Sequence, residues 1–312
     1  FFFCVFIDFA GIICYHGHSI FEEVTFMAAI DNIRALCARG IYSNTPESAL
    51  PQTAVAHMID AFLASPDGGR RRRVLVYGLD GVRADCCPVA YQQGGCAYLA
   101  KAGDNVLSYA GGDKSRPETI QQTCTWQGWA SILTGEWGIV NGVVEFTPVR
   151  GDCPTVLLRA ARRGLSCSLS VVWPDHFRMT YSGEIEAAKN EKLPLYHILA
   201  KGEDDLHKTV LDRIDAGDDI IFSISDGPDH AGHSTGFSPD NPEYVKEVCK
   251  RDMLALEAIR HIEERAEFSS EDWLYIITTD HGGHALTHFD QSDDDRFTFI
   301  AANKKELFNE AL

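Results

Sequence analysis

From residue 73 onward, short apolar runs alternate with amphipathic segments. The five runs are rich in branched and aromatic residues, which is typical of buried strands, and they span residues 74–79, 167–173, 219–225, 273–279 and 297–302. The segments between them carry apolar residues at helical spacing, and the clearest are residues 155–163, 203–216 and 241–266. Buried strands separated by helices predict an α/β fold, a three-layer α/β/α sandwich around a mainly parallel central sheet. In such sheets, binding sites lie at the carboxyl ends of the strands.

The chain is expected to divide into an N-terminal extension, residues 1–72, and a catalytic domain, residues 73–312. A polar, proline-containing connector spans residues 43–53, and SPDGGRRRR at 65–73 combines a turn signal with a basic run. The arginines fit either a binding patch or the solvated flank of a strand. The first fourteen residues are apolar but lack a basic start, which favours a buried strand or hairpin over a clipped signal or anchor. They are also shorter than the about 20 residues that span a bilayer.

The charge and the cysteines limit the partners and the compartment. Lys and Arg number 28 against 45 Asp and Glu, a formal net charge of −17, which argues against a nucleic-acid duplex or a membrane as a partner. An anionic substrate would therefore need local positive charge, which metal ions supply. The ten cysteines are scattered without a CxxC pair, which predicts a reduced, cytoplasmic chain. Nothing in the sequence indicates the oligomeric state.

Three of the predicted strands end on side chains that can bind metal ions. Each strand end taken alone also has an explanation without a metal. Asp-Gly is a common turn, Asp-x-x-x-His occurs often by chance, and charged loop residues are usually solvated. Together, carboxylates and imidazoles are ligands for zinc, manganese or iron, and the set is large enough for two ions. The candidates are Asp80, Asp229, His233, Asp280, His281 and His288.

Thr125 is the candidate nucleophile. It precedes an apolar, helix-compatible run, so its hydroxyl is expected at a helix N-terminus, where backbone N–H groups and the helix dipole favour an anion. The alternative is that Thr125 is a plain helix cap. A metal contact would lower the pKa of the hydroxyl and activate it for attack. Two ions about 3.5 to 4 Å apart can hold the attacking and leaving oxygens of a displacement at phosphorus.

Four motifs carry a family resemblance over about residues 73–302. In order they are LDGVR, TCT followed by SILTG, PDHAGH, and TDHGG with a histidine eight residues after its Asp. This series resembles the type I phosphodiesterase/nucleotide pyrophosphatase branch of the alkaline phosphatase superfamily. The resemblance implies an alkaline-phosphatase-like fold and two divalent ions, Zn²⁺ or Mn²⁺. It also implies cleavage of phosphodiester or pyrophosphate bonds in a small phosphorylated substrate such as a nucleotide, through a phospho-threonine intermediate at Thr125.

The resemblance also implies how the ligands are divided. One ion would be held by Asp229, His233 and His288. The second would be held by Asp80, Asp280 and His281, with Thr125 as nucleophile touching it. His284 has no role in the family pattern and is expected in a supporting or surface position.

The sequence departs from the family pattern beside the nucleophile. Gly128 replaces an Asn that helps to hold a phosphate oxygen, and the backbone N–H of Trp126, Gln127 or Asn141 is left as a substitute. Losing one such donor costs about 10² to 10³ in rate. A phosphomonoesterase, a phosphonate hydrolase and a catalytically impaired metal-binding homologue therefore remain alternatives.

Other residues near the motifs bear on the substrate. No Arg is adjacent to Thr125, the nearest being Arg116 and Arg150, and this favours a diester over a dianionic monoester. The tryptophans at 126, 129 and 137 either stack on a base or belong to the core. Tyr181 is expected in a substrate-facing loop.

Overall fold

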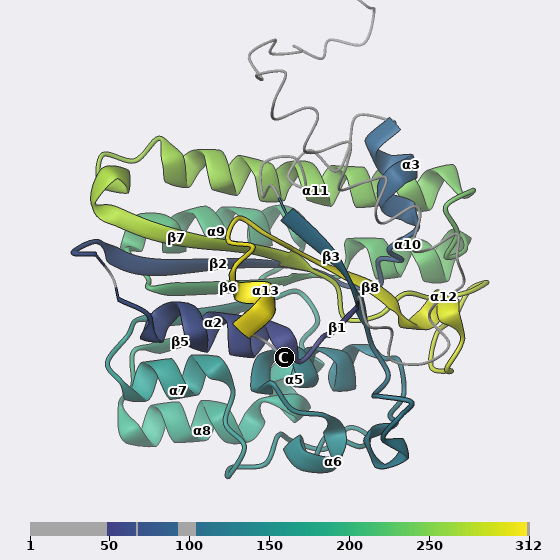
Figure 1. The fold of residues 1–312 in the computed structure, drawn as a ribbon, viewed down its shortest axis with the longest axis horizontal. Coiled ribbons are helices and arrows are strands. Elements are labelled where there is room, and N and C mark those ends of the chain that lie inside the picture. The colour runs from purple at the N-terminus through teal and green to yellow at the C-terminus, as the bar shows by residue number, and fades with distance from the viewer. Residues whose placement is uncertain (1–48, 67, 93–103, 311–312) are drawn as a thin grey trace, which may run out of the picture.

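Strand β2 (Arg71–Leu79) lies in the middle of an eight-stranded sheet (Figure 1). The computed structural model describes residues 49–66, 68–92 and 104–310, and the strand order within them is β1-β3-β8-β7-β2-β6-β4-β5. The other strands are β1 (Leu50–Pro51), β3 (Asp104–Tyr109), β4 (Cys167–Val171), β5 (Leu195–Leu199), β6 (Ile220–Ser225), β7 (Glu271–Thr278) and β8 (Phe297–Ala302). Only β8 pairs antiparallel with its neighbours among these strands, so the prediction of a mainly parallel sheet is confirmed.

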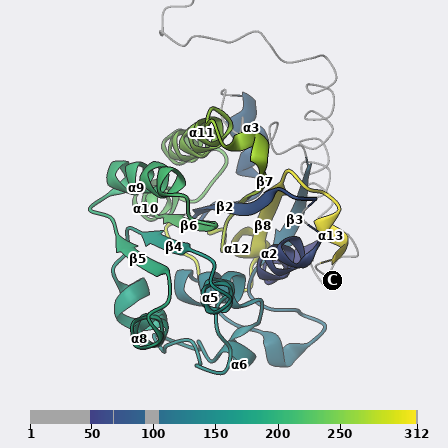
Figure 2. The ribbon, with the colours of Figure 1, turned by 90° about the vertical axis from the view of Figure 1, so that its left-hand side faces the viewer.

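Helices cover both faces of the sheet (Figures 1 and 2). The helices on one face are α3 (Cys86–Gln92), α9 (Glu203–Ala216), α10 (Gly227–Thr235) and α11 (Pro242–Glu263). Those on the other face include α2 (Ala54–Ala64), α5 (Thr125–Thr134), α6 (Gly138–Asn141), α7 (Val156–Arg162) and α8 (Ser182–Glu191). Two short helices near the C-terminal end are α12 (Asp293–Arg296) and α13 (Leu307–Glu310). Two buried hydrophobic clusters lie between the layers, as expected for a three-layer α/β/α sandwich.

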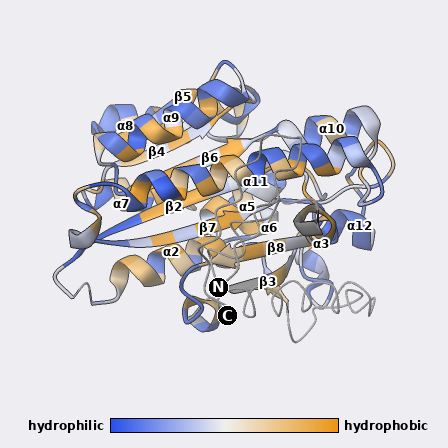
Figure 3. Ribbon diagram, turned by 90° about the horizontal axis from the view of Figure 1, so that it is seen from above, coloured by the Kyte–Doolittle hydropathy of each residue, from blue (hydrophilic) through white to orange (hydrophobic). Residues whose placement is uncertain are grey.

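The hydrophobic pattern explains which elements form. Every residue of β4 and β6 is buried, which matches their continuous apolar runs. Helix α11 instead buries a stripe that includes Val245, Val248 and Ile259, while Met253 is exposed. Figure 3 shows the same contrast, with hydrophobic strands inside and mixed colours along α9 and α11.

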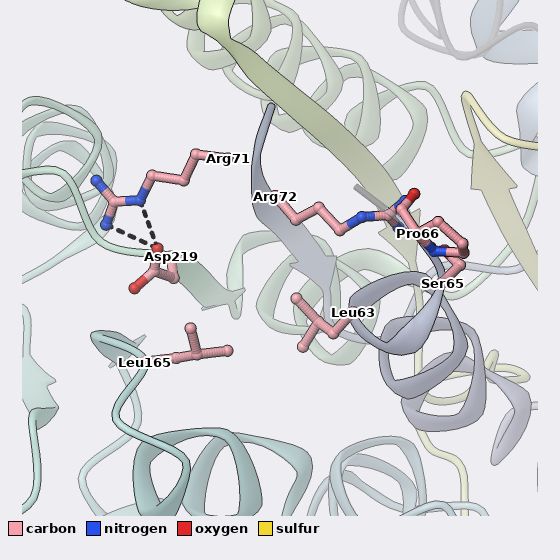
Figure 4. A pocket seen from close by; sticks show the side chains of 7 residues that line it. All are labelled: Leu63, Ser65, Pro66, Arg71, Arg72, Leu165 and Asp219. Carbon is pink, nitrogen blue, oxygen red and sulfur yellow. Dashed lines mark hydrogen bonds and ion pairs between the residues drawn. The ribbon is translucent and has the colours of Figure 1, made fainter. Parts of the chain in front are cut away.

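The basic run at the start of β2 makes ion pairs within the fold. Arg73 is fully buried and its Nη1 lies 2.8 Å from Oε1 of Glu271. Arg71 pairs with Asp219 at 2.7 Å beside an open hollow of about 670 Å³ (Figure 4). Arg72 is bound to the carbonyl of Phe62, at the end of α2. The run therefore anchors the amino end of the strand instead of forming a free basic patch.

The predicted extension is described only in part. Residues 1–48, including the apolar first fourteen, lie outside the described residues, so the division at residue 72 stays a prediction. Residues 49–72 contribute β1, α2 and the start of β2 to this sheet and its core. Within the described ranges no helix has the length and apolarity needed to cross a membrane. Cys87, Cys124, Cys153 and Cys167 carry free thiols.

Candidate functional site

The predicted metal-binding residues meet at the carboxyl end of the central strands. Asp80 follows β2, while Asp280 and His281 follow β7, the neighbour on one side. Asp229 and His233 lie on α10, which follows β6, the neighbour on the other side. Because these three strands are parallel and adjacent, their carboxyl ends lie side by side. The loop after β7 then brings His288 back to the same place.

One cluster is formed by Asp80, Asp280 and His281, all fully buried or nearly so. The Nε2 atom of His281 lies 3.3 Å from Oδ1 of Asp80 and 3.5 Å from Oδ2 of Asp280. The hydroxyl of Thr125 lies 3.4 Å from Oδ1 of Asp80 and 3.4 Å from Nε2 of His281. The candidate nucleophile is therefore in direct contact with this cluster.

A second cluster is formed by Asp229, His233 and His288. Nε2 of His233 lies 3.3 Å from Oδ2 of Asp229 and 3.1 Å from Nε2 of His288, and Nε2 of His288 lies 3.7 Å from Oδ1 of Asp229. The rings of His281 and His288 stack with their centroids 4.0 Å apart. The two clusters therefore adjoin, and Asp229 lies within reach of both.

Hydrogen bonds on the far side of the three imidazoles set their orientation. The Nδ1 atoms of His233, His281 and His288 lie 2.8, 2.7 and 2.9 Å from backbone carbonyl oxygens. A carbonyl only accepts, so each Nδ1 carries a hydrogen and each Nε2 is directed into the site. Carbonyl partners of this kind orient metal-binding histidines in proteins.

Unpaired atoms in the clusters also fit metal ions. Oδ1 of Asp229 and Oδ2 of Asp280 are buried without a hydrogen-bond partner. When both rings are neutral and carry their hydrogen on Nδ1, the facing Nε2 atoms of His233 and His288 are both acceptors and cannot bond to each other. A cation in each cluster would satisfy these atoms, so the side chains present fit divalent metal ions.

The electrostatics of the site show an excess of buried negative charge. Burial and the charge of Asp80 raise the pKa of Asp229 to about 6 and raise the pKa of Asp280 well above its usual range. Burial lowers the pKa of His281, but the charges of Asp280 and Asp80 outweigh it and raise that pKa to about 10. The pKa of Asp80 is lowered despite its burial because His281 and Trp129 hydrogen-bond to it. Without metal, the cluster thus binds protons where cations would sit.

A cavity of about 170 Å³ opens onto both clusters. Its wall is partly aromatic, because Trp126, Trp173 and Phe289 line it, and the ring centroid of Trp126 lies 5.8 Å from that of Phe289 and 6.4 Å from that of Trp173. Phe146 packs against Trp126, with centroids 4.2 Å apart. The residues that line it are Asp80, Thr125, Trp126, Trp173, Asp226, Asp229, His230, His233, His288 and Phe289. Among these described lining residues there is no Lys or Arg.

Only one of the three predicted tryptophans reaches the cavity. Trp126 lines it. Trp129 is fully buried in the core, and Trp137 stacks on Tyr109 with centroids 6.0 Å apart.

The start of α5 narrows the choice of phosphate-binding donors. Thr125 is the first residue of this helix, and its first helical hydrogen bond runs from Gly128 N–H to Cys124 O at 2.8 Å. The N–H groups of Trp126 and Gln127 come before that bond and have no acceptor within the helix, so they can donate to a phosphate oxygen. The N–H of Asn141 instead donates to Trp137 O at 3.0 Å. Trp126 and Gln127 are therefore the better substitutes for the missing Asn.

The glycine at position 128 has a packing reason. A Cβ atom at this position would lie 2.8 Å from Cβ of Asp280 and 3.0 Å from its carbonyl oxygen. Helix α5 therefore approaches the loop after β7 so closely that a side chain at position 128 would force a shift of one or the other. Gly128, where the family pattern has an Asn, thus allows Asp280 to lie close to α5.

His284 lies beside the site and supports the loop. Its Nδ1 lies 2.6 Å from Oδ1 of Asp295, whose other oxygen accepts from the hydroxyl of Thr123 at 3.2 Å. The carbonyl of Thr123 in turn accepts from His288.

Several cavity residues were not expected from the sequence, among them Asp226, His230, Trp173 and Phe289. Asp226 could have been found, because it directly follows the buried strand β6 and so obeys the strand-end rule.

Comparisons with known proteins find similarity among solved structures. No protein-family model matches the chain, and no curated protein matches it. Among solved structures, murine ectonucleotide pyrophosphatase/phosphodiesterase 5 in complex with AMP is similar, with 16% identity, a TM-score of 0.47, and coverage of 68% of this chain and 57% of that one. Phosphonoacetate hydrolase from Sinorhizobium meliloti in complex with phosphonoformate follows, with 13% identity, a TM-score of 0.45, and coverage of 69% and 57%.

A third similar structure is the C-terminal periplasmic domain of phosphoethanolamine transferase from Campylobacter jejuni, with 14% identity, a TM-score of 0.47, and coverage of 76% and 81%. The chain thus spans 57% of the length of the first two.

Proposed function

We propose that this protein is a two-metal hydrolase that cleaves phosphodiester or pyrophosphate bonds in a small phosphorylated substrate such as a nucleotide. The observation that carries the proposal is the position of Thr125. Its hydroxyl begins helix α5, lines the cavity, and lies 3.4 Å from both Asp80 and His281. A hydroxyl in that position can act as a nucleophile beside a cation site. A hydroxyl that only capped a helix would have no such contact with the proposed metal ligands.

The chain offers two sets of ligands for divalent ions, Zn²⁺ or Mn²⁺. Asp229, His233 and His288 would hold one ion, and Asp80, Asp280 and His281 the other, in contact with Thr125. When bound, such ions stabilise negative charge on the attacking and leaving oxygens.

The reaction of the chain itself begins at Thr125. Its hydroxyl faces Oδ1 of Asp80, an acceptor for the proton that leaves as the oxygen attacks phosphorus. Attack forms the Thr125 phosphoester and breaks the bond to the leaving group, and water then hydrolyses that ester. The N–H groups of Trp126 and Gln127 at the start of α5 would donate to the phosphoryl oxygens.

The lining of the cavity favours a diester over a monoester. A monoester dianion carries one more negative charge than a diester, and no Lys or Arg is among the lining residues described. The aromatic wall around Trp126 offers an apolar surface for the organic group of the substrate.

The test compares bis-p-nitrophenyl phosphate with p-nitrophenyl phosphate. Wild-type protein loaded with Zn²⁺ or Mn²⁺ should cleave the diester faster, and a chelator should abolish the activity. Thr125→Ala should lose at least about 10³-fold in kcat, while Thr125→Ser should keep part of it. Turnover that survives in Thr125→Ala would contradict the assignment of the nucleophile. Tight metal binding without turnover of any ester would instead support a catalytically impaired homologue.

A further inference from the structure

We propose that His230 contacts the leaving group of the substrate and selects a pyrophosphate bond over a simple phosphodiester bond. This inference rests on the proposed hydrolase function and adds to it the residue that recognises the leaving group. His230 lies on α10, is exposed, and lines the cavity that opens onto both clusters. It is not one of the six proposed metal ligands, so its place in the cavity needs another explanation.

One face of α10 lines the cavity. The cavity residues that this helix and its N-cap supply are Asp226, Asp229, His230 and His233, at positions i, i+3, i+4 and i+7. Residues at these spacings lie on the same face of an α-helix. Asp229 and His233 are proposed ligands, and Asp226 is only 5% exposed at the start of the helix. His230 is therefore the side chain on this face that is left to contact a substrate.

The nucleophile and α10 reach the cavity from the two faces of the sheet. Thr125 begins α5, which covers one face, whereas α10 covers the other (Figure 2). In a displacement at phosphorus, the attacking and leaving oxygens lie roughly in line on opposite sides of the phosphorus atom. Attack from Thr125 therefore directs the leaving group toward α10 and its cavity-lining face.

His230 offers a hydrogen-bond donor on the side where the leaving group would lie. An imidazole carries an N–H in both its neutral and its charged form. Among the described lining residues, the other side-chain N–H groups outside the proposed ligands belong to Trp126, on α5, and Trp173, after β4. Tyr181 does not compete for this role, because it is fully buried and absent from the cavity lining, and so does not face the substrate as expected from the sequence.

The exposure of His230 places it toward the mouth of the cavity, beyond the ligands on its own helix. The bridging oxygen of the scissile bond would face the ion held by Asp229, His233 and His288, so a side chain farther out meets the next atoms of the leaving group. In a pyrophosphate these are the nonbridging oxygens of a second phosphoryl group, which accept hydrogen bonds. In an alkyl or aryl diester they are carbon atoms, which do not. A donor at this position therefore discriminates between the two bonds.

The proposed step conserves atoms and charge. The hydroxyl oxygen of Thr125 forms a bond to phosphorus as its proton passes to Asp80, and the bond from that phosphorus to the bridging oxygen breaks. The electron pair of the broken bond stays on the leaving phosphate, whose negative charge increases. The N–H of His230 donates to a nonbridging oxygen of this phosphate, so its hydrogen bond becomes stronger in the transition state than in the bound substrate. No Lys or Arg among the described lining residues offers this charge another partner.

Two thymidine nucleotides that differ only in the leaving group test the proposal. Thymidine 5′-triphosphate releases pyrophosphate and the p-nitrophenyl ester of thymidine 5′-monophosphate releases p-nitrophenol, while both transfer the same phosphoryl group to Thr125. In full-length protein loaded with Zn²⁺, His230→Phe should lower kcat/KM for the triphosphate about 10- to 100-fold, the effect of losing one hydrogen bond to a charged group. It should change kcat/KM for the p-nitrophenyl ester less than about threefold. His230→Gln keeps an N–H donor and should retain part of the triphosphate activity.

His261→Phe is the matched control. His261 is a partly exposed histidine on α11 that lies 2.8 Å from Asp215 and does not line the cavity, so this variant should cleave both substrates as wild type does. Calorimetric titration with Zn²⁺ should give the same number of bound ions in His230→Phe as in wild type, and a lost ion would show that His230 is a ligand and overturn the assignment. Circular dichroism checks the fold of each variant; if His230→Phe does not fold, His230→Ala carries the same test.

The outcomes separate this inference from the proposed function. Equal losses on both nucleotides in His230→Phe, or no loss on either, would overturn the contact with the leaving group. Wild type that cleaves bis-p-nitrophenyl phosphate but leaves the triphosphate intact would also overturn it, and the hydrolase proposal would stand. No turnover of any of these three compounds by wild type would overturn both.

Discussion

Trp129 donates its indole N–H to Oδ2 of Asp80 at 2.8 Å. This bond connects the hydrophobic core to the cluster that Asp80 forms with Asp280 and His281. The indole is fully buried and lies edge-on to Phe222, with centroids 6.0 Å apart. A Cβ atom on Gly78 would come within 2.4 Å of its ring, so the strand carries a glycine where the indole packs. The direction of the Asp80 carboxylate is therefore set by a side chain that has no access to solvent.

Replacing Trp129 by Phe should weaken metal binding while leaving the fold intact. Loss of the hydrogen bond frees Asp80 to rotate, and removing a partner of this kind typically lowers metal affinity about 10- to 100-fold. Calorimetric titration with Zn²⁺ measures the change. Trp137→Phe is the matched control, because Trp137 stacks on Tyr109, and it should bind as wild type does. Equal affinities in both variants would contradict the role given to the indole.

Gly128→Ala should be destabilising, although Ala usually stabilises a helix interior by about 0.5–1 kcal/mol over Gly. The added Cβ would lie 2.8 Å from Cβ of Asp280, so α5 or the metal-binding loop must shift. Overpacking of this kind costs about 1–3 kcal/mol in the free energy of unfolding. Urea denaturation measures it. Gly183→Ala on α8 is the control, since nothing lies within 4 Å of its Cβ, and it should be neutral or stabilising.

Metal affinity should fall in acid. Burial and the charge of Asp80 raise the pKa of Asp229 to about 6 in the metal-free protein, so protons compete for this ligand below that pH. Titrations with Zn²⁺ at pH 5 and pH 7 should show weaker binding at pH 5. Binding should also release protons, which is seen as a dependence of the calorimetric enthalpy on the buffer. An affinity that does not change between these pH values would count against Asp229 as a ligand.

Glu271→Gln should lower stability at neutral pH and remove part of its acid sensitivity. Burial raises the pKa of Glu271, but hydrogen bonds from Trp273 and Arg73 outweigh it and lower that pKa below the usual 4.5. The carboxylate thus contributes stability that is present above pH 4.5 and is lost as the pH falls through the folded-state pKa. Removing one partner of a buried pair costs about 3–5 kcal/mol.

Thermal melting from pH 3 to pH 7 measures this contribution. The loss of melting temperature on acidification should be smaller in Glu271→Gln than in wild type. Glu257→Gln serves as the control, because its carboxylate is 61% exposed and a surface pair contributes at most about 1 kcal/mol. Identical pH profiles for wild type and Glu271→Gln would refute the assignment.

The strands that are followed directly by site residues could be predicted from the sequence. Each is a buried apolar run that ends at a charged residue, as at Asp80 and Asp280. Strand β5 was missed since it is an edge strand whose burial is incomplete, so its sequence lacks a continuous apolar pattern. His176 was missed for another reason. It lies in the turn after β4, with a ring nitrogen within 4.8 Å of a carboxylate oxygen of Asp80, and no spacing in the sequence reports which residue of a turn faces inward.

The two ends of β2 perform separate tasks. Arg73 is locked to Glu271 at one end, and Asp80 stands at the other, about 23 Å away for seven extended residues. Substitutions that far apart are usually additive. A substitution of Arg73 should therefore reduce the fraction of molecules that is folded. A substitution of Asp80 should instead reduce the activity of each folded molecule. Loss of activity in a cell can then be traced to one route or the other by comparing protein abundance with turnover per molecule.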